Sequence, residues 1–401
     1  MNICVIANGY PNEHEPQYGC FERDQALALL NNEHRVSILY VDGRLNSPNK
    51  RKRGIFHAEY KGIQVFGIYV LPISGIRLIN KRLHYWVVTR LLEKAYIQML
   101  KKSGKPDIIY AHFMYNIAYA VYLKKKYGIS LVGIEHWSVL NRSKLSKEQM
   151  FWGNIAYNGA DRILAVSESL QIKIREHFKR NSIVVYNMLG EEFVKHTSTK
   201  YLKKESDAIY QDALKDGHFF FLGVGSLIQR KGFDILIEAF AKSHLMEKGC
   251  RVVIVGGGPE HDILKKLSIT MGVAEGVSLV GRQNKAEIIN IMRASDVFVL
   301  SSRAETFGVV CIEALSQGLP NIATICGGPE EFLTEEDGIL IPTGNVDALA
   351  NAMLQMYNNY SHYNKKSIIE HCTKRFAPQV IVSQLTNIFM EVLEQNRVNN
   401  N

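Results

Sequence analysis

Long apolar runs are missing from this sequence of 401 residues. A membrane-spanning helix needs about 18 consecutive apolar residues, and no stretch of the chain approaches that length. The first ten residues, MNICVIANGY, have no apolar segment behind a basic flank, so we interpret them as a first core strand rather than a cleaved signal. With 46% apolar and 22% charged residues, the composition is typical of a soluble globular protein.

Closely spaced cysteines are missing as well. The six cysteines, at positions 4, 20, 250, 311, 326 and 372, include no C-x-x-C pair, and several lie within apolar patterns. Zinc sites and disulfide frameworks both use cysteines at short, regular spacings. We therefore interpret the six as reduced thiols in the core of a cytoplasmic protein.

Two ligand-binding motifs do not occur. The glycine-rich turns at 223–225 and 256–258 do not extend to G-x-G-x-x-G, which argues against an NAD-dependent oxidoreductase. No D-x-D occurs anywhere in the chain, and no side chain stands out as a nucleophile.

Positive charge is abundant but unevenly spread. The net charge is +9, and residues 1–200 carry 29 Lys and Arg against 16 Asp and Glu, so the first half is strongly basic. The second half carries 19 against 23 and is mildly acidic. Charge alone leaves anionic lipid, a phosphate-bearing acceptor and nucleic acid open as partners of the first half.

The chain alternates between short apolar strands and helical segments. We predict strands at 3–7, 36–41, 63–70, 108–113, 130–137, 162–167 and 183–188, and then at 219–226, 251–258, 277–281, 296–302, 321–325 and 338–342. The predicted helices of the second half are 232–248, 259–271, 284–294, 308–317 and 345–357. Apolar strands joined by helices indicate an α/β fold whose parallel sheets are buried on both faces.

The alternation of apolar strands and helices is interrupted at one place in the sequence. Apolar residues become sparse between 195 and 217, which predicts a boundary between two domains of about 200 residues each. We expect one Rossmann-like domain at 1–200, a second at 201–376, and a final segment at 377–401 built around a helix of about 378–396. Ligand sites in such sheets lie at the carboxyl ends of the strands.

The segment 296–332 concentrates chemistry at one such strand end. Glu305 and Glu313 bracket Gly308, where a helix is predicted to begin. Bare amides at a helix N-terminus favour anions, and carboxylates beside them suit sugar hydroxyls. The ordinary alternative is a capping carboxylate together with a solvated helix glutamate. A glutamate within the apolar run VVCIEALS argues against that alternative, because an unpaired buried carboxylate is costly.

Three other turns of the second half are candidates for the same site. Arg230 and Lys231 lie between the strand that ends near Gly225 and a helix beginning near Gly232, where fixed cations favour a pyrophosphate. Gly257 lies in a glycine turn that either lines a nucleotide cleft or only packs a tight turn. Arg282 lies at a turn suited to a nucleotide base, and an ordinary loop is the alternative.

The first half offers two candidates at predicted strand ends. The loop that contains Gly19 follows the first strand, and His136 ends the strand at 130–137. Both positions fall at the carboxyl edge of the predicted sheet. A single histidine at a strand end is often structural, but its position beside the loop favours a functional role.

Residues 76–102 form a basic helical pattern. Arg77, Lys81, Arg82, Arg90, Lys94, Lys101 and Lys102 face a single acid, Glu93, and aromatic residues lie between them. The pattern fits a helix lying on anionic lipid, or a helix packed on a sheet with a solvated basic face. No recognition motif supports nucleic acid as the partner.

The motifs taken together resemble a known family. G-x-L-x-x-x-K-G at 225–232, E-T-F-G-x-x-x-x-E-A at 305–314, the G-L-P at 318–320 and GGPEE at 327–331 resemble the retaining GT-B glycosyltransferases of family GT4. The resemblance covers nearly the whole chain and is most specific at 219–342. It implies two Rossmann-like domains facing across a cleft, with the C-terminal helix crossing back to the N-terminal domain.

The resemblance also implies roles for individual residues. Arg230 and Lys231 would neutralise the diphosphate of a UDP- or GDP-sugar, Glu313 would bind the ribose, and Glu305 would hold the donor sugar. Backbone amides of Phe307, Gly308 and Val309 would contact the phosphate and sugar, and Gly225, Gly257 and Arg282 would complete the donor site. His136 would lie near the sugar, and the Gly19 loop would approach the phosphate from the other domain. The candidate catalytic residues are thus His136, Arg230, Lys231 and Glu305.

The expected reaction is transfer of a sugar to a hydroxyl of a glycan or lipid-linked glycan, with retained anomeric configuration, in surface-polysaccharide assembly. We expect no cofactor and no metal, because Arg230 and Lys231 can stabilise the leaving diphosphate where a D-x-D motif is missing. We expect the protein in the cytoplasm, at the inner face of the membrane. The alternatives are a non-catalytic sugar-nucleotide-binding subunit and a sugar-nucleotide epimerase of similar fold.

Overall fold

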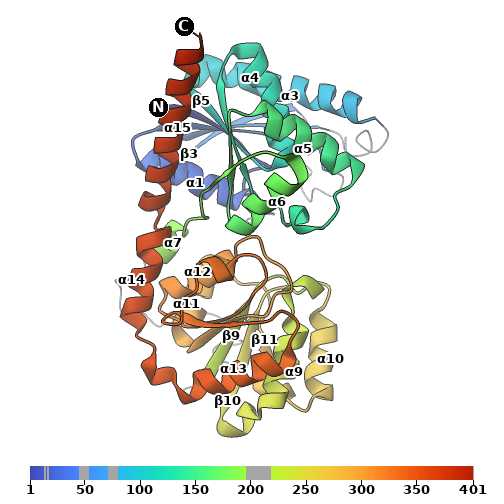
Figure 1. Ribbon diagram of the computed structural model, residues 1–401, viewed down its shortest axis with the longest axis vertical. Coiled ribbons are helices and arrows are strands. Elements are labelled where there is room, and N and C mark those ends of the chain that lie inside the picture. Colours follow the sequence, from blue (N-terminus) through green and yellow to red (C-terminus); the bar gives the residue numbers. More distant parts are fainter. Residues whose placement is uncertain (13–14, 16–17, 45–53, 71–79, 196–217, 401) are drawn as a thin grey trace. The chain divides into compact units, whose positions relative to one another are not determined.

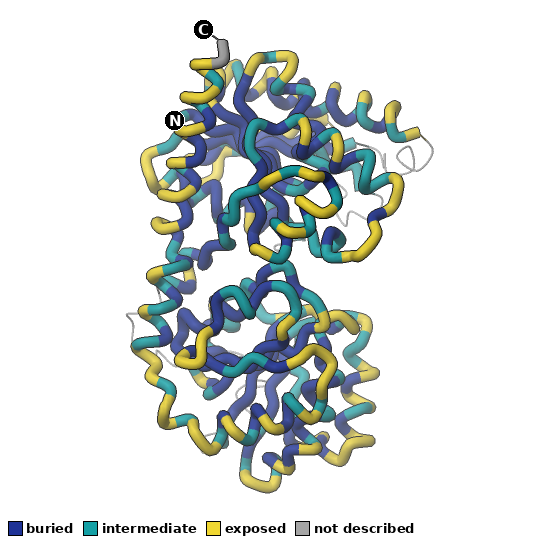
Figure 2. Tube along the Cα trace, viewed as in Figure 1, coloured by how far each residue is buried: buried dark blue, intermediate teal, exposed yellow. Residues whose placement is uncertain are grey.

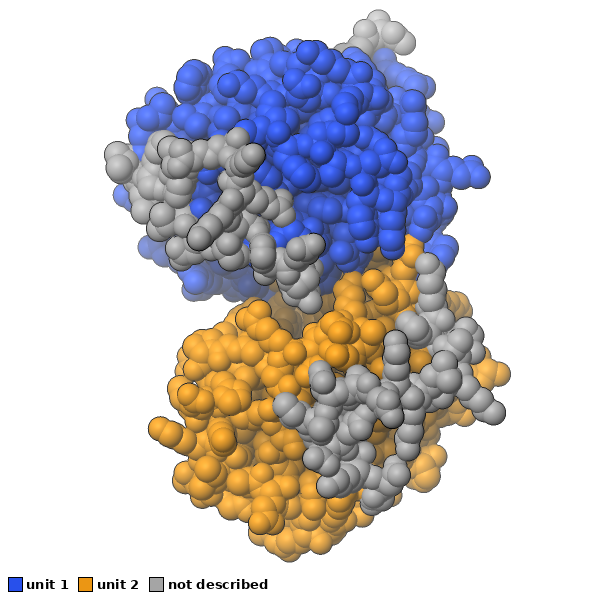
Figure 3. Space-filling model, turned by 180° about the vertical axis from the view of Figure 1, so that it is seen from behind, with its two compact units in different colours: residues 1–186, 378–401 blue, residues 187–377 orange. Residues whose placement is uncertain are grey.

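The computed structural model describes residues 1–12, 15, 18–44, 54–70, 80–195 and 218–400. The chain forms two compact units (Figure 3), one made of Met1–Tyr186 together with Pro378–Asn401 and the other of Asn187–Ala377. The unit boundary therefore falls after Tyr186, whereas the sequence pattern predicted it near residue 200. The residues on which that prediction rested, 196–217, lie outside the described residues.

Unit 1 is built around a sheet of eight strands among the described residues, in the order β3-β4-β2-β1-β5-β6-β7-β8 (Figure 1). The strands are β1 (Asn2–Ile6), β2 (Arg35–Asp42), β3 (Gly54–Tyr60), β4 (Ile63–Tyr69), β5 (Ile108–His112), β6 (Ser130–Glu135), β7 (Arg162–Ala165) and β8 (Ile183–Val184). All of their pairings are parallel except that of β3 with β4. The strand predicted at 183–188 is thus much shorter, and β3 was not predicted.

The helices of unit 1 connect these strands. They are α1 (Cys20–Asn31), α3 (Lys81–Ser103), α4 (Met114–Tyr127), α5 (Lys147–Gly159) and α6 (Glu168–Phe178). The first begins at Cys20, directly after Gly19, which takes a left-handed backbone conformation with φ of 76° and ends the preceding loop. None of the described helices of the chain is both long and apolar enough to cross a membrane.

The last helix, α15 (Pro378–Asn400), belongs to unit 1. It packs against α1 and β6, so the two ends of the chain lie in the same unit (Figure 1). Polar contacts add to this packing, since Thr386 Oγ1 lies 3.0 Å from His34 Nε2 and Asn396 Nδ2 donates to Ser130 Oγ at 2.9 Å.

Unit 2 is a parallel sheet of six strands among the described residues, in the order β11-β10-β9-β12-β13-β14. Its strands are β9 (Phe219–Val224), β10 (Cys250–Val255), β11 (Val277–Leu279), β12 (Val297–Leu300), β13 (Asn321–Thr324) and β14 (Gly338–Ile341). In this register Phe298 of β12 lies opposite Leu222 of β9 and Asn321 of β13. Apart from β3, which is largely exposed at the edge of its sheet, the strands of both sheets are mostly buried (Figure 2), as their apolar sequences predicted.

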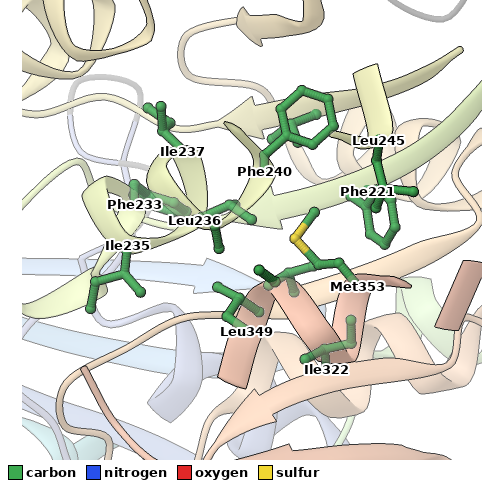
Figure 4. Close-up of a cluster of buried hydrophobic side chains, with 14 of the residues drawn as sticks. Phe221, Phe233, Ile235, Leu236, Ile237, Phe240, Leu245, Ile322, Leu349 and Met353 are labelled. Atoms are coloured by element: carbon green, nitrogen blue, oxygen red, sulfur yellow. The ribbon is translucent and has the colours of Figure 1, made fainter. Parts of the chain in front are cut away.

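The helices of unit 2 are α7 (Glu191–Lys195), α9 (Phe233–Ser243), α10 (His261–Thr270), α11 (Lys285–Ala294), α12 (Val309–Ser316), α13 (Val346–Asn358) and α14 (Lys365–Phe376). Figure 4 shows the core where α9 meets α13, with Leu236 and Phe240 beside Leu349 and Met353. This core fixes α9, and with it the loop that enters α9 from β9.

Candidate functional site

Several loops of unit 2 leave the carboxyl edge of its sheet. They follow β9, β10, β11, β12 and β13, and the β9 and β12 loops come from neighbouring strands. This is the edge at which ligands bind in open α/β sheets. The predicted candidates of the second half all lie on these loops or at the start of α12.

Lys231 and Glu305 form the centre of this edge. Lys231 Nζ lies 2.6 Å from Glu305 Oε1, and Ser302 Oγ donates to the same oxygen at 2.7 Å. The two paired side chains are only 16% and 8% exposed, so the ion pair is largely shielded from water. The Lys231 chain runs past Gly225, where an added Cβ would lie 3.6 Å from its Cδ and Cε.

Arg230 lies on the exposed side of that pair. Its Nη1 donates to the Ala304 carbonyl at 3.1 Å and lies 3.8 Å from Glu305 Oε2. The structure therefore brings Arg230, Lys231 and Glu305 together, although 74 residues separate them in the chain. Two cations within reach of one carboxylate leave a net positive site at this edge.

Arg303 holds the β12 loop against the β9 loop. Its guanidinium makes a two-pronged contact with Asp234, at 2.9 and 2.6 Å, and donates to the Gln229 carbonyl at 2.6 Å. Burial acts to raise the pKa of Asp234, but the hydrogen bonds from Arg303 outweigh it and lower the pKa. The sequence did not predict this contact, because no motif in the sequence indicates that Arg303 and Asp234 are neighbours.

Gly232 allows the same two loops to meet. Its φ is 67°, and an added Cβ would lie 2.0 Å from the Ser301 carbonyl oxygen. Only glycine fits both the backbone conformation and the close approach. Lys231, which precedes Gly232, is therefore positioned by a turn that requires glycine.

The helix α12 begins at the same edge. Gly308, with φ of 89°, precedes Val309, and the first-turn amides of a helix have no partner within it. Phe307 is 1% exposed and packs with Phe332 and Phe376, so only its backbone can meet a ligand. Glu313 lies one turn along the helix and is partly exposed.

The glycine turns after β9 and β10 pack closely on each other. An added Cβ at Gly256 would lie 1.7 Å from the Gly225 carbonyl oxygen, and one at Gly257 would lie 2.7 Å from Arg282 Nε. Close packing therefore explains part of the glycine content of these turns. It also places Gly225, Gly257 and Arg282 in one group beside Lys231.

The Cys326–Gly328 turn, which overlaps the GGPEE motif, is closed by a carboxylate. It leads into a single 3-10 turn, Pro329–Glu331. The Glu330 carboxylate accepts from the backbone N–H groups of Cys326, Gly327 and Gly328 at 3.3, 2.8 and 3.1 Å. These amides are therefore satisfied within the loop, and Glu330 fixes its shape.

In unit 1, Gly19 and His136 also follow strands. Gly19 lies between β1 and α1, where an added Cβ would meet the Gly9 carbonyl oxygen at 2.3 Å. His136 follows β6 and is partly exposed. The sequence missed its neighbour His112, at the end of β5, whose Nδ1 lies 3.2 Å from His136 Nε2.

Glu135, which precedes His136, is fully buried. It accepts from the backbone N–H groups of His136 and Trp137, both at 2.9 Å, and from the Tyr157 hydroxyl at 2.6 Å. Burial raises its pKa despite these hydrogen bonds. Glu135 therefore fixes the backbone on which the histidine is carried. Among the described residues, no group of three His, Cys, Asp or Glu side chains is arranged to hold a metal ion.

Two parallel-sheet units, with the last helix returning to the first, define the GT-B class of α/β proteins. The structure of HepE from Anabaena in complex with UDP-glucose matches with a TM-score of 0.72 and 19% identity, over 98% of this chain and 100% of that chain. Together with the strand orders, this similarity confirms the predicted fold.

Two family models match the sequence: Glycosyltransferase Family 4 over residues 23–189 and Glycosyl transferases group 1 over residues 204–370. Together they span most of the chain, which therefore belongs to the glycosyltransferases of family 4 type. This result confirms the family drawn from the motifs, whereas retention of configuration stays a prediction.

Individual relatives agree with this assignment. N-acetyl-alpha-D-glucosaminyl L-malate synthase of Bacillus anthracis is 26% identical over 306 residues, which is 73% of this chain and 76% of the relative. The lipopolysaccharide core biosynthesis glycosyltransferase LpsE of Rhizobium meliloti is 35% identical over 136 residues, which is 34% of this chain and 38% of that protein.

Proposed function

We propose that this protein transfers a sugar from a nucleotide-diphosphate donor to a hydroxyl of a glycan or lipid-linked glycan. The observation that carries the proposal is the group of Arg230, Lys231 and Glu305 beside the N-terminus of α12. Cations and helix amides suit a diphosphate, whereas carboxylates suit sugar hydroxyls. One ligand that carries both groups is a sugar nucleotide.

The contacts suggest which residue binds which chemical group of the donor. The Lys231 ammonium has three donors, so it can keep Glu305 and still bind a diphosphate oxygen. Arg230 adds a second cation on the exposed side, and the amides of Phe307 to Val309 add dipoles. In this assignment Glu305 binds hydroxyls of the donor sugar and Glu313 binds the ribose. Gly225, Gly257 and Arg282 line the nucleotide end.

The chemistry follows from the leaving group. Breaking the bond between the sugar and the diphosphate builds negative charge on the β-phosphate, and Arg230 and Lys231 are placed to stabilise that charge. We therefore expect transfer to persist in the presence of a chelator. In unit 1 we assign His136 to the donor sugar and the Gly19 loop to the phosphate. Retention of configuration, by attack of the acceptor on the face that the diphosphate leaves, follows from the family likeness.

A lipid-linked acceptor in polysaccharide assembly is supported by the relationship to LpsE and by α3. The outer face of α3 exposes Trp86 (57%) and Leu83 (47%) beside Arg82, Arg90 and Lys94. An indole among cations suits the boundary of an anionic membrane. The inner face of the same helix packs on β2, β4 and α4, as the packed-helix alternative predicted, and we propose lipid contact for the outer face alone. Residues 76–79 of that pattern lie outside the described residues.

The test is a transfer assay in which purified protein is incubated with UDP- and GDP-sugars, lipid-linked acceptors and a chelator. A glycosylated acceptor and free nucleoside diphosphate support the proposal, and the anomeric configuration of the product tests retention. Free nucleotide with an altered sugar and no acceptor product would instead identify an epimerase. Donor binding without turnover would identify a non-catalytic subunit.

Membrane contact is tested separately. We expect co-sedimentation with vesicles that contain phosphatidylglycerol, and loss of most of this binding in a Trp86→Ser/Lys94→Glu variant. Equal binding to neutral vesicles, or no change in the variant, would contradict the role given to α3.

A further inference from the structure

His112 and His136 come from neighbouring strand ends of unit 1. β5 and β6 pair in parallel with His112 opposite Ile134, so His136 follows two residues beyond that register. His112 is 1% exposed, whereas His136 is partly exposed. The buried ring therefore lies behind the accessible one.

The two rings lie in nearly parallel planes and face each other edge to edge. Their planes differ by 3°, their centres are 5.3 Å apart, and Nδ1 of His112 lies 3.2 Å from Nε2 of His136. Because the two nitrogens are much closer together than the ring centres, they must lie on the facing edges of the two rings. This is the geometry of an N–H···N hydrogen bond, in which one of the facing nitrogens carries the proton.

The surroundings of Nε2 of His112 indicate which of the two facing nitrogens carries the proton. Nε2 of His112 is buried and has no hydrogen-bond partner in the part of the chain that the structure describes. If the proton of His112 were on Nε2, that buried N–H would have no acceptor, and such orphaned donors are rare. The arrangement that avoids this puts the proton on Nδ1 of His112, which donates to Nε2 of His136.

The position of the proton on His112 also determines the tautomer of His136. If Nε2 of His136 accepts a hydrogen bond, the proton of a neutral His136 must be on its Nδ1. A second proton on Nε2 would force His112 to move its own proton to the partnerless Nε2. Burial, and then the neighbouring His136, hold the pKa of His112 well below its usual range, in agreement with a neutral pair.

We propose that His112 is a positioning residue that holds His136 as a neutral imidazole with its proton on Nδ1. His136 then acts towards the donor sugar as a hydrogen-bond donor and not as an acid. This role in transfer rests on the proposed function, whereas the protonation state can be observed in the protein alone. The surroundings fit an imidazole held in place, since Tyr110 packs on His112 and Phe113 on His136.

The first experiment is long-range ¹⁵N–¹H NMR of histidine-labelled protein without donor, with the His136 signals assigned from a His136→Asn variant. We expect a protonated Nδ1 and an unprotonated Nε2 on His136 in the wild type. A His112→Phe variant should lose this pattern and show mixed tautomers. A His112→Asn variant should keep it, because the amide nitrogen of asparagine can occupy the place of Nδ1.

The matched control is His84→Phe, which removes another buried imidazole of unit 1 and should leave the His136 pattern unchanged. A wild-type His136 with its proton on Nε2 would overturn the proposal. An unchanged pattern in His112→Phe would also overturn it.

The second experiment is kinetic. We expect His112→Phe to lower kcat about tenfold or more with little change in the KM of the donor, and His112→Asn to restore most of the rate. If the tautomer pattern holds but neither His112→Phe nor His136→Asn changes transfer, the proposed role of His136 fails while the inference about the pair stands. If His136→Asn abolishes transfer but both His112 variants match the wild type, the positioning role is overturned.

Discussion

Lys231 has two roles in the proposed site, since it partners Glu305 and is placed to receive the diphosphate. Replacing it with alanine would remove the cation and leave a carboxylate that is 8% exposed without its ammonium partner. Removing one member of a buried ion pair typically costs about 3–5 kcal/mol. We expect Lys231→Ala to lower the melting temperature and to abolish measurable transfer, with both checked on the same purified protein.

Lys124 provides the matched control. It pairs with Asp161 at the same distance, 2.6 Å, and is also partly buried, but this pair lies at the start of β6, whereas His136 follows the end of that strand. Lys124→Ala should lower stability while transfer persists at a temperature where both variants are folded. Normal turnover by folded Lys231→Ala would remove Lys231 from the proposed site.

At the scale of residues, the sequence predicted Arg230, Lys231 and Glu305 as one group, and the structure brings them together. The sequence could predict this because each of the three lies in a loop that follows a strand, and the strand ends of a parallel sheet share one edge. Ser302 and Glu330 were not predicted, since their roles depend on which atom faces which carboxylate or amide. The one available signal for His112 was its position at the end of the strand next to that of His136.

At the scale of elements, the packing of the β9 loop on the β12 loop depends on a backbone conformation that few residues other than glycine adopt. Gly232→Ala would put a Cβ 2.0 Å from the Ser301 carbonyl in a left-handed conformation. We expect a loss of more than about 1 kcal/mol in stability, because the β9 and β12 loops must separate. Weaker donor binding should accompany it, measured by calorimetric titration. Gly344→Ala is the control, since its φ is 73° but its added Cβ meets nothing within 4 Å.

The pair α3 and α4 is joined by a buried carboxylate. Glu93 accepts from Tyr122 at 2.8 Å and Tyr127 at 2.7 Å, and it pairs with Arg90 and Lys126. Burial acts to raise the pKa of Glu93, but the hydrogen bonds from Lys126 and the other partners lower it to about 2.

This lowered pKa predicts a pH dependence of stability. The contribution of Glu93 should be complete above its ordinary pKa of 4.5 and should disappear as the pH falls towards 2. We expect Glu93→Gln to destabilise the protein at pH 7 by about 1–3 kcal/mol, and the difference from wild type to shrink below pH 4.5. Chemical unfolding at several pH values measures this, and a difference independent of pH would contradict it.

Most elements were predictable because their apolar strands are continuous and their helices have apolar faces. The exceptions have physical reasons. β3 is largely exposed and antiparallel, so it lacks the continuous apolar run of a buried parallel strand. The helix α14 has only three buried side chains, Ile368, Cys372 and Phe376, in twelve residues, so its apolar stripe is narrow and polar residues dominate the segment.

For the whole molecule, α15 is part of the core of unit 1. It buries Ile381, Val382, Leu385, Ile388, Phe389 and Val392. At about 1.5–3 kcal/mol for each buried apolar side chain, their loss would match the total stability of a typical domain. We expect a chain ending at Ala377 to lose the unfolding transition of unit 1 in calorimetry but to retain that of unit 2. Two intact transitions would contradict this.

The chain enters unit 2 after Tyr186 and leaves it at Pro378, and just inside these points the Leu189 N–H donates to the Phe376 carbonyl at 2.9 Å. Unit 2 is therefore an insertion whose two ends are adjacent, although they are nearly two hundred residues apart in the chain. Because the two ends of the unit are adjacent in the folded protein, the segment that encodes it can be replaced without changing the path of the remaining chain. Under the proposed assignment of the donor site to unit 2, exchanging this unit between relatives would exchange donor preference and leave the core of unit 1 intact.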